Sequence, residues 1–215
     1  MKKIILSTLL AVCVALMGFA QDKKTEFGVQ GGYSYNMPKG TDYDAVTGNS
    51  NGFHVGPVVN FNINEALAFH TGLLYNYFKS TQKIIIVLNN WTQYKTYTHQ
   101  LDMPLRLQYS IPLADDLQVR LLAGPSLDFA LNKYVNKEIV VDKKVVEKLT
   151  EKGDNLYSDH NTYSPLDLQF GIGVALHYYH FSVMAGYDWG LLDRNISTSY
   201  KFRANDIKLS IAYTF

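Results

Sequence analysis

Seven charged residues stand out because they lie in stretches whose other face is strongly apolar. They are Asp102, Arg106, Arg120, Asp128, Asp167, Asp188 and Lys208. Acids and bases occur together among them, so they offer either a path for protons and ions or an internal network of salt bridges. The elements that carry these residues decide between the two kinds of chemistry.

Three histidines, His54, His70 and His177, fall on the same face as these charges. Each stands alone in its stretch, without the paired spacing that a zinc site usually shows. We therefore expect ordinary hydrogen bonding from them, and we predict no metal ion and no cofactor.

Catalytic residues of a lipid-modifying enzyme would have to come from a few scattered side chains. The candidates are His99, Ser126, Ser80 and His160, and none of them lies in a nucleophile motif. The segment GIGVAL at 171–176 is not followed by the helix that accompanies a nucleotide-binding glycine loop. We predict that the protein is not an enzyme, with a lipid-modifying enzyme as an alternative.

Large apolar residues recur at every second position in eight stretches, which is the period of a β-strand and not of a helix. The stretches cover about 26–35, 52–62, 67–78, 97–110, 117–129, 166–178, 181–191 and 205–215. Each apolar face is about ten residues long, which is the length of a tilted strand that crosses a bilayer.

Three further features favour a membrane barrel over a soluble one. Aromatic residues gather near the ends of the stretches, as interfacial girdles do. The connections alternate between long polar ones (36–51, 80–96, 130–164 and 192–204) and short ones (63–66, 111–116 and 178–180). Glycines punctuate the polar face, where a narrow lumen needs them.

The sequence therefore predicts an all-β fold, an eight-stranded antiparallel up-and-down transmembrane β-barrel. Eight strands leave no open aqueous channel. We thus expect the seven charged residues to form a polar plug in the lumen and not an ion path. The alternative is a soluble, lipocalin-like binder of small ligands, whose interior would be apolar.

Two of the long connections carry patterns of their own. Residues 83–97 are predicted to extend the third hairpin beyond the bilayer, with its tip at Asn89–Asn90. Within 130–164, KEIVV and KVVEK could form a small hairpin around Asp142–Lys143, or VVEKLTEKG could form a short helix.

The first 20 residues have the features of a cleaved secretory signal peptide: Lys2 and Lys3, an apolar run, and a small-residue ending at Ala20. Residues 21–215 are then one barrel domain. Removal of the two lysines from 20 basic residues leaves 18 against 19 acidic ones, so no charge excess points to nucleic acid. Cys13 leaves with the signal, which excludes disulfides and thiolate chemistry.

Four segments resemble the PorT-like outer-membrane β-barrel family of Bacteroidota-type bacteria. They are LDMPLRLQY (101–109), LLAGPSLDF (121–129), DLQFGIGVALHY (167–178) and YDWGLLD (187–193). The resemblance covers nearly all of the mature chain. It implies an eight-stranded barrel similar in architecture to the transmembrane part of OmpA. The family's namesake is associated with protein secretion, but no motif of this chain carries that role.

A barrel of this kind is expected in the bacterial outer membrane, where it contacts membrane lipids and lipopolysaccharide. The polar loops are the expected binding parts, since loops on a rigid scaffold commonly carry function; a protein partner is one candidate. The last strand alternates strictly and ends at Phe215. It resembles the signal that the outer-membrane assembly machinery recognises.

Overall fold

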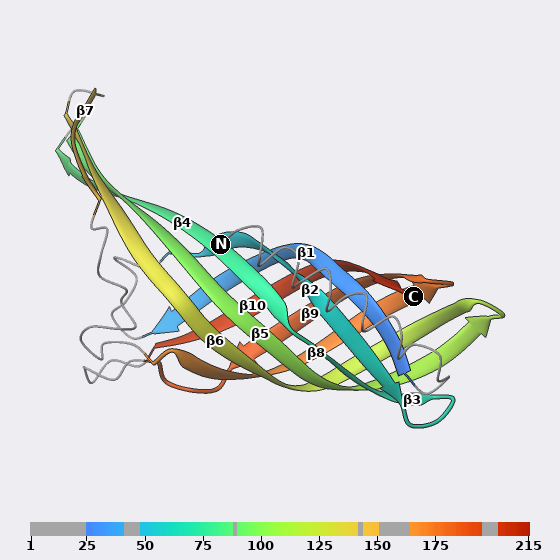
Figure 1. Ribbon diagram of the computed structural model, residues 1–215. Coiled ribbons are helices and arrows are strands. Elements are labelled where there is room, and N and C mark those ends of the chain that lie inside the picture. Colours follow the sequence, from blue (N-terminus) through green and yellow to red (C-terminus); the bar gives the residue numbers. More distant parts are fainter. Residues whose placement is uncertain (1–24, 41–47, 88–89, 142–143, 151–163, 195–201) are drawn as a thin grey trace, which may run out of the picture.

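The computed structural model describes residues 25–40, 48–87, 90–141, 144–150, 164–194 and 202–215 (Figure 1). The predicted signal peptide and the tip residue Asn89 lie outside these ranges. The described residues form ten β-strands. They are β1 (Thr25–Gly40), β2 (Ser50–Asn62), β3 (Leu67–Gly72), β4 (Leu74–Val87), β5 (Asn90–Ala114), β6 (Leu117–Val141), β7 (Lys144–Thr150), β8 (Leu166–Tyr178), β9 (Phe181–Gly190) and β10 (Phe202–Thr214). Within the same ranges, no helix is long and apolar enough to cross a membrane.

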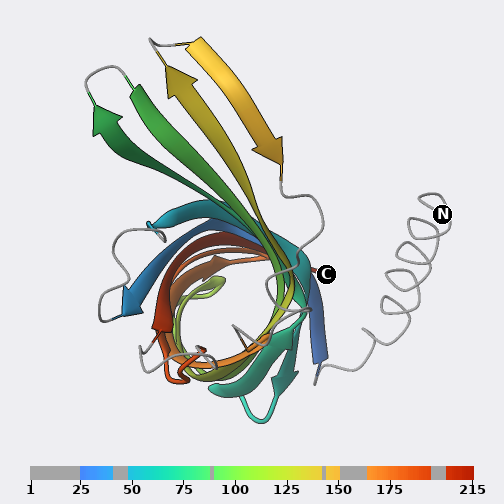
Figure 2. The same ribbon diagram turned by 90° about the vertical axis from the view of Figure 1, so that its left-hand side faces the viewer.

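The strands close into a ring with eight antiparallel strand positions. There are eight because β3 and β4 together fill one position and β7 lies outside the ring. Figure 2 shows this ring viewed along its axis. Cross-strand partners can be followed around it from β1 back to β1. The path runs through Thr25, Phe61, Phe69, Leu107, Ala123, Ile172, Tyr187, Ile207 and Tyr35. It returns ten residues further along β1, so the strands are tilted as closure of a small barrel requires.

The predicted stretch 67–78 is divided at Leu73 into β3 and β4. The register of both neighbours places a proline beside this point: Pro57 of β2 opposite Leu73, and Pro104 of β5 opposite Gly72. A proline has no amide proton to donate to the ladder. The pairing register is the same on both sides of the break. β3 and β4 therefore act as one interrupted strand, and the ring still has eight strand positions.

The outer face of the ring is apolar and the inner face is polar. Val174 and Ile211 on the outside are 47% and 63% exposed, whereas Asn76 and Asp167 on the inside are 0% exposed. This arrangement suits a wall surrounded by lipid, because the large apolar side chains have no protein to pack against. The apolar interior expected of a lipocalin-like binder is therefore wrong for this chain.

Short turns connect the strands at one end of the ring. In the first of them, the side chain of Asn64 accepts hydrogen bonds from the amides of Ala66 and Leu67 at 2.9 and 2.8 Å. This is the local geometry that makes asparagine a turn residue. The chain also ends here, and the Phe215 amide donates to the Phe27 carbonyl at 2.8 Å. The predicted pairing of the last strand with the first is confirmed.

Three strands, β4, β5 and β6, continue past the other end of the ring, and β7 joins them there. β6 is 25 residues long, and its pairing with β8 ends at Phe129–Leu166, while its pairing with β5 continues to Trp91–Val140. β4 and β7 flank this pair, and Figures 1 and 2 show the four strands leaving the barrel together. We call β7 and the parts of β4, β5 and β6 beyond the ring the projecting sheet.

The projecting sheet decides between the two structures expected for 130–164. β7 pairs with β6 from Val141–Lys144 to Asn136–Thr150, so the small hairpin is confirmed and the short helix is wrong. The extended third hairpin is confirmed as well, since β4 and β5 remain paired as far as Val87–Asn90. The described parts of the long connections at 80–96 and 130–164 are therefore mostly strand.

Candidate functional site

The seven charged residues of the sequence analysis all point into the lumen. None is more than 8% exposed, and Asp102, Asp128 and Asp167 are at most 1% exposed. These three aspartates occupy neighbouring cross-strand positions on β5, β6 and β8. Like charges placed directly opposite one another destabilise a sheet unless cations lie near.

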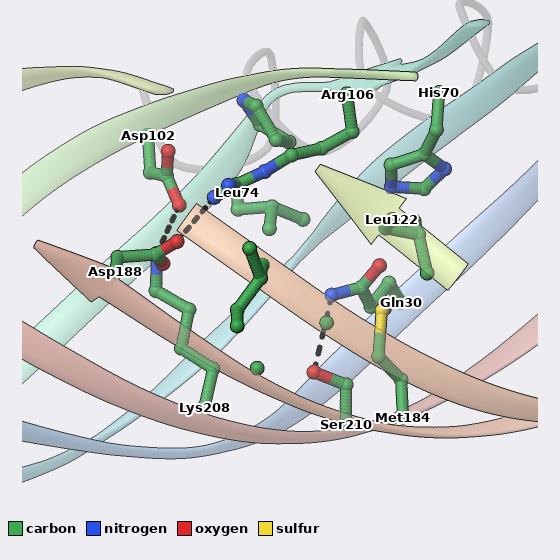
Figure 3. Close-up of a pocket in the computed structure, with 14 residues that line it drawn as sticks. Gln30, His70, Leu74, Asp102, Arg106, Leu122, Met184, Asp188, Lys208 and Ser210 are labelled. Atoms are coloured by element: carbon green, nitrogen blue, oxygen red, sulfur yellow. Dashed lines mark hydrogen bonds and ion pairs between the residues drawn. The ribbon is translucent and has the colours of Figure 1, made fainter. Parts of the chain in front are cut away.

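Four of the seven residues meet at the centre of the lumen, and we call them the central cluster. Lys208 Nζ lies 2.5 Å from Asp102 Oδ2 and 3.1 Å from Asp188 Oδ2. Arg106 forms a salt bridge with Asp188 through Nη2 and donates from Nη1 to the Gly124 carbonyl at 2.7 Å. Figure 3 shows the side chains of Arg106 and Lys208 converging on Asp188.

Strand register explains this meeting. Asp188 on β9 pairs with Gly171 on β8, and a Cβ at Gly171 would overlap both the Asp188 carboxylate and the Arg106 guanidinium. The absence of a side chain at residue 171 thus provides the volume that the ion pair occupies. Asp102 is held on its other side by the hydroxyl of Ser126, which donates to it.

The remaining three predicted residues form no salt bridge with the central cluster. Arg120 faces Glu26 at 3.5 Å near the short-turn end, and Asp167 lies 3.9 Å from Arg194 towards the other end. Asp128 differs from both, because among the described residues no basic side chain forms a salt bridge with it; its two carboxylate oxygens also have no hydrogen-bond partner there. Within the described part of the chain, the seven predicted residues therefore form one tight cluster, two looser pairs with Glu26 and Arg194, and one buried acid without a salt bridge.

The lumen also contains polar residues that were not singled out from the sequence. Asp206 accepts hydrogen bonds from Asn36 at 2.7 Å and from Gln169 at 3.0 Å. Asp206 and Glu26 fall at every second position together with the inward residues of their own strands. The alternation in the sequence could therefore have identified them as lumen residues. Gly171 could be recognised only once its neighbours were known.

The three histidines make hydrogen bonds with uncharged neighbours. His54 lies between Ser34 at 2.7 Å and Ser210 at 2.8 Å, His70 contacts Asn60 at 2.7 Å, and His177 contacts Ser182 at 2.8 Å. Within the described ranges, no three His, Cys, Asp or Glu side chains are grouped so that they could hold a metal ion.

The residues considered for an enzyme do not come together. His99 faces outward and shares a 2.5 Å hydrogen bond with the Tyr75 hydroxyl. Ser126 donates to Asp102 inside the lumen, and Ser80 donates to the carbonyls of Gly48 and Asn49 at 3.1 and 3.2 Å. His160 lies outside the described residues.

Cavities beside these residues are small. The central cluster borders a cavity of about 50 Å³ that is also lined by Gln30, His70 and Ser210 (Figure 3). Two others along the lumen measure about 40 and 20 Å³. Since about 10–15 Å³ of such space is enough for one water molecule, each cavity has room for only a few waters.

A closed ring with an apolar exterior and a charged interior is the architecture of an outer-membrane barrel. A family model described as "outer membrane protein beta-barrel domain" matches residues 19–194. The chain belongs to this family. Its place is accordingly the outer membrane, and the short-turn end of such a barrel faces the periplasm. We call the opposite end the extracellular end.

Several solved structures resemble this chain at low sequence identity. Ail, the attachment invasion locus protein of Yersinia pestis, is 13% identical over 89% of this chain and 99% of its own, with a TM-score of 0.42. Neisserial surface protein A is 13% identical over 88% of this chain and 97% of its own, with a TM-score of 0.44. The translocator domain of NalP from Neisseria meningitidis is 6% identical over 99% and 96%, with a TM-score of 0.40. A comparison with curated proteins gave no match.

Proposed function

We propose that the protein is a non-conducting scaffold of the outer membrane, with its function in binding at the extracellular end. The observation that carries this proposal is the central cluster, in which Lys208 and Arg106 draw together three strands across the lumen. A narrow lumen filled by paired charges supports a stable wall and leaves little room for solute.

The projecting sheet supports the binding role. It adds ordered structure beyond the ring at the extracellular end, where loops of outer-membrane barrels are long. A sheet anchored in a closed barrel presents its faces with little loss of conformational freedom on binding. Its partner would be lipopolysaccharide, another protein or a host surface.

Conductance measurements test the sealed lumen. We expect the full-length mature protein to show no steady channel current in a planar bilayer, and the same result at high salt. A large, steady conductance would contradict the proposal.

Cross-linking in native outer membranes tests the binding role. A photo-reactive residue placed at Tyr94 or Lys137, both in the projecting sheet, should capture a defined partner. The same residue at Val174 on the lipid-facing wall is the control and should capture lipid only. Equal products from both positions would argue against an extracellular binding surface.

Three finer expectations belong to this proposal. Export would use the segment 1–20, and N-terminal sequencing of the mature protein should then begin at Gln21. Assembly would use β10 and the residue that follows it, Phe215, so removing Phe215 should lower the folded fraction in the membrane. Kinship with the PorT-like family of Bacteroidota-type bacteria would connect the chain to secretion, and loss of secreted proteins on deletion of the gene would support this.

The protein is also proposed not to be an enzyme. Expression of the chain should leave the mass of lipid A unchanged, because His99, Ser126 and Ser80 have separate partners. A change in lipid A acylation that depends on one of these residues would overturn this part of the proposal.

A further inference from the structure

A continuous set of ring contacts runs across the outward face of β2, β4, β5 and β6. We call it the aromatic strip, and its members are Phe53, Tyr75, Tyr77, Tyr97, His99 and Tyr134. Ring centroids are 5.4 Å apart for Phe53–Tyr77, 5.2 Å for Tyr77–His99 and 5.0 Å for Tyr97–Tyr134. These are the separations of favourable aromatic pairs, so the strip is a preformed surface.

The strip rises from the membrane wall onto the projecting sheet. Phe53 is 49% exposed on β2, within the ring. Tyr134 lies five residues beyond Phe129, the last β6 residue that pairs with β8. The ladder with β5 skips one β6 residue between Ala130 and Asn132, so four regular steps of about 3.3 Å place Tyr134 about 13 Å further along the strand. The aromatic girdle of a barrel stays at the membrane interface, whereas this strip continues beyond it.

A cation lies at the edge of the strip. Lys79 Nζ is 5.8 Å from the centre of the Tyr97 ring, and the Lys79 side chain is exposed. A second lysine nearby, Lys95, forms a salt bridge with Glu138 at 2.7 Å. Among the described residues, no acidic side chain forms a salt bridge with Lys79, so its ammonium group is available to an anion.

The position and chemistry of the strip select one kind of occupant. Its lower end adjoins the lipid-facing wall, so the occupant is anchored in the outer leaflet and rises from it. Tyrosine and histidine rings provide flat apolar faces with polar edges, which suit the faces and hydroxyl groups of sugars. Lys79 adds the positive charge that a phosphate group would neutralise. A plain phospholipid would not reach along the whole strip.

We propose that the aromatic strip and Lys79 bind the phosphorylated sugar headgroup of an outer-leaflet glycolipid, lipopolysaccharide. This inference deepens the proposed binding role of the extracellular end. It does not depend on whether the lumen is sealed, because the strip lies on the opposite face of the wall.

Titration with purified lipopolysaccharide tests the proposal. The full-length mature protein is placed in nanodiscs of phosphatidylcholine, and binding of short-core lipopolysaccharide is measured by native mass spectrometry. We expect Y97L combined with Y134L to weaken binding at least about tenfold, since that corresponds to a loss of about 1.4 kcal/mol shared by two stacked rings. K79Q should weaken it about two- to fivefold, in keeping with one exposed charge pair.

Matched controls separate the strip from the rest of the wall. Tyr187 and Trp189 on β9 form another outward aromatic pair, with ring centroids 4.7 Å apart. The double variant Y187L with W189L and the variant K39Q, at an exposed lysine of β1, should bind lipopolysaccharide like the unchanged protein. Heat-modified gel mobility verifies that every variant is folded.

Two further ligands identify which part of the headgroup is recognised. Chemically dephosphorylated lipopolysaccharide should bind more weakly and should no longer respond to K79Q. Phosphatidylglycerol, an anionic lipid without the sugar core, should bind equally to the unchanged protein and the Y97L/Y134L variant. The proposal is overturned if the strip variants bind lipopolysaccharide normally, or if the β9 control loses as much affinity. Such a result would not contradict the proposed binding role of the extracellular end, because the cross-linking test could still capture another partner there.

Discussion

The barrel wall and the projecting sheet are made of the same strands but meet different solvents. Within the ring, lipid surrounds the outside, so charged side chains turn inward and become buried, as Lys208 and Asp102 do. In the projecting sheet, the strand pairs continue without closure. Lys95 and Glu138 then form a salt bridge with side chains 26% and 11% exposed, against 9% and 1% for Lys208 and Asp102.

This difference shows that a lysine–carboxylate pair has different consequences for stability in the two regions. A buried ion pair is costly to break because the remaining charge has no water. Breaking a partly exposed ion pair costs little free energy, since water replaces the missing partner. Substitutions of comparable chemistry in the two regions should therefore differ in effect by several kcal/mol.

Lys208→Met should give the largest effect. Asp102 and Asp188 both lose their ammonium partner, and breaking a buried ion pair from one side costs about 3–5 kcal/mol. Urea unfolding in detergent micelles, followed by heat-modified gel mobility, measures the change. A loss below about 1 kcal/mol would mean that water enters the cluster freely.

Ile172→Arg tests the outer face of the wall. Ile172 is 50% exposed on β8, and arginine facing the middle of a bilayer costs about 2–4 kcal/mol. Folding into lipid vesicles should be strongly reduced. The matched substitution Asn132→Arg, at an exposed residue of β6 beyond the ring, should fold like the unchanged protein.

Gly171→Ala examines the space beneath the central cluster. The added methyl group overlaps Asp188 and Arg106, so we expect a loss of about 1–3 kcal/mol from overpacking. Gly186→Ala is the control on the same lumen face, because its Cβ would lie 3.4 Å from the nearest atom, the Ile172 carbonyl oxygen. Equal urea midpoints for the two variants would contradict the predicted overlap.

Asp128→Asn should have a smaller effect of the opposite sign. The carboxylate has no hydrogen-bond partner among the described residues and lies beside Asp102 and Asp167. Replacing it with a neutral group of the same shape should raise the free energy of unfolding by about 1 kcal/mol. Destabilisation in the same urea assay would show that the charge at residue 128 is needed by its neighbours.

Lys95→Met should give the smallest effect, because its salt bridge with Glu138 is partly exposed. We expect a change of about 0.2–1 kcal/mol. Comparison with Lys208→Met, measured identically, gives the difference between the two regions directly. Equal losses would mean that the projecting sheet is as dry as the lumen.

Alternation in the sequence was enough to predict the ring. The stretches at 166–178 and 205–215 coincide with β8 and β10 to within three residues at each end. Alternation succeeds here because lipid on one side and a polar lumen on the other impose opposite chemistry on successive residues. The phase of each strand also identified inward charges such as Asp102 and Lys208.

The projecting sheet was harder to predict, because both of its faces accommodate polar residues. Residues 80–96 and 130–141 are mixed in polarity, so alternation alone places them in connections, although their strand pairs are continuous with the barrel. Only the hairpin patterns at 83–97 and around Asp142–Lys143 indicate strands there. The sequence of the stretch 67–78 likewise does not predict the break at Leu73, since the cause lies in Pro57 and Pro104 of the neighbouring strands.

The sequence by itself determined which residues face lipid and which face the lumen, because that choice follows from a period of two and one apolar solvent. Only the tertiary structure decided which lumen residues meet. Lys208 and Asp102 are 106 residues apart in the chain, and their contact depends on the tilt that brings the path around the ring back ten residues along β1. That tilt is a property of the closed ring, and no single strand encodes it.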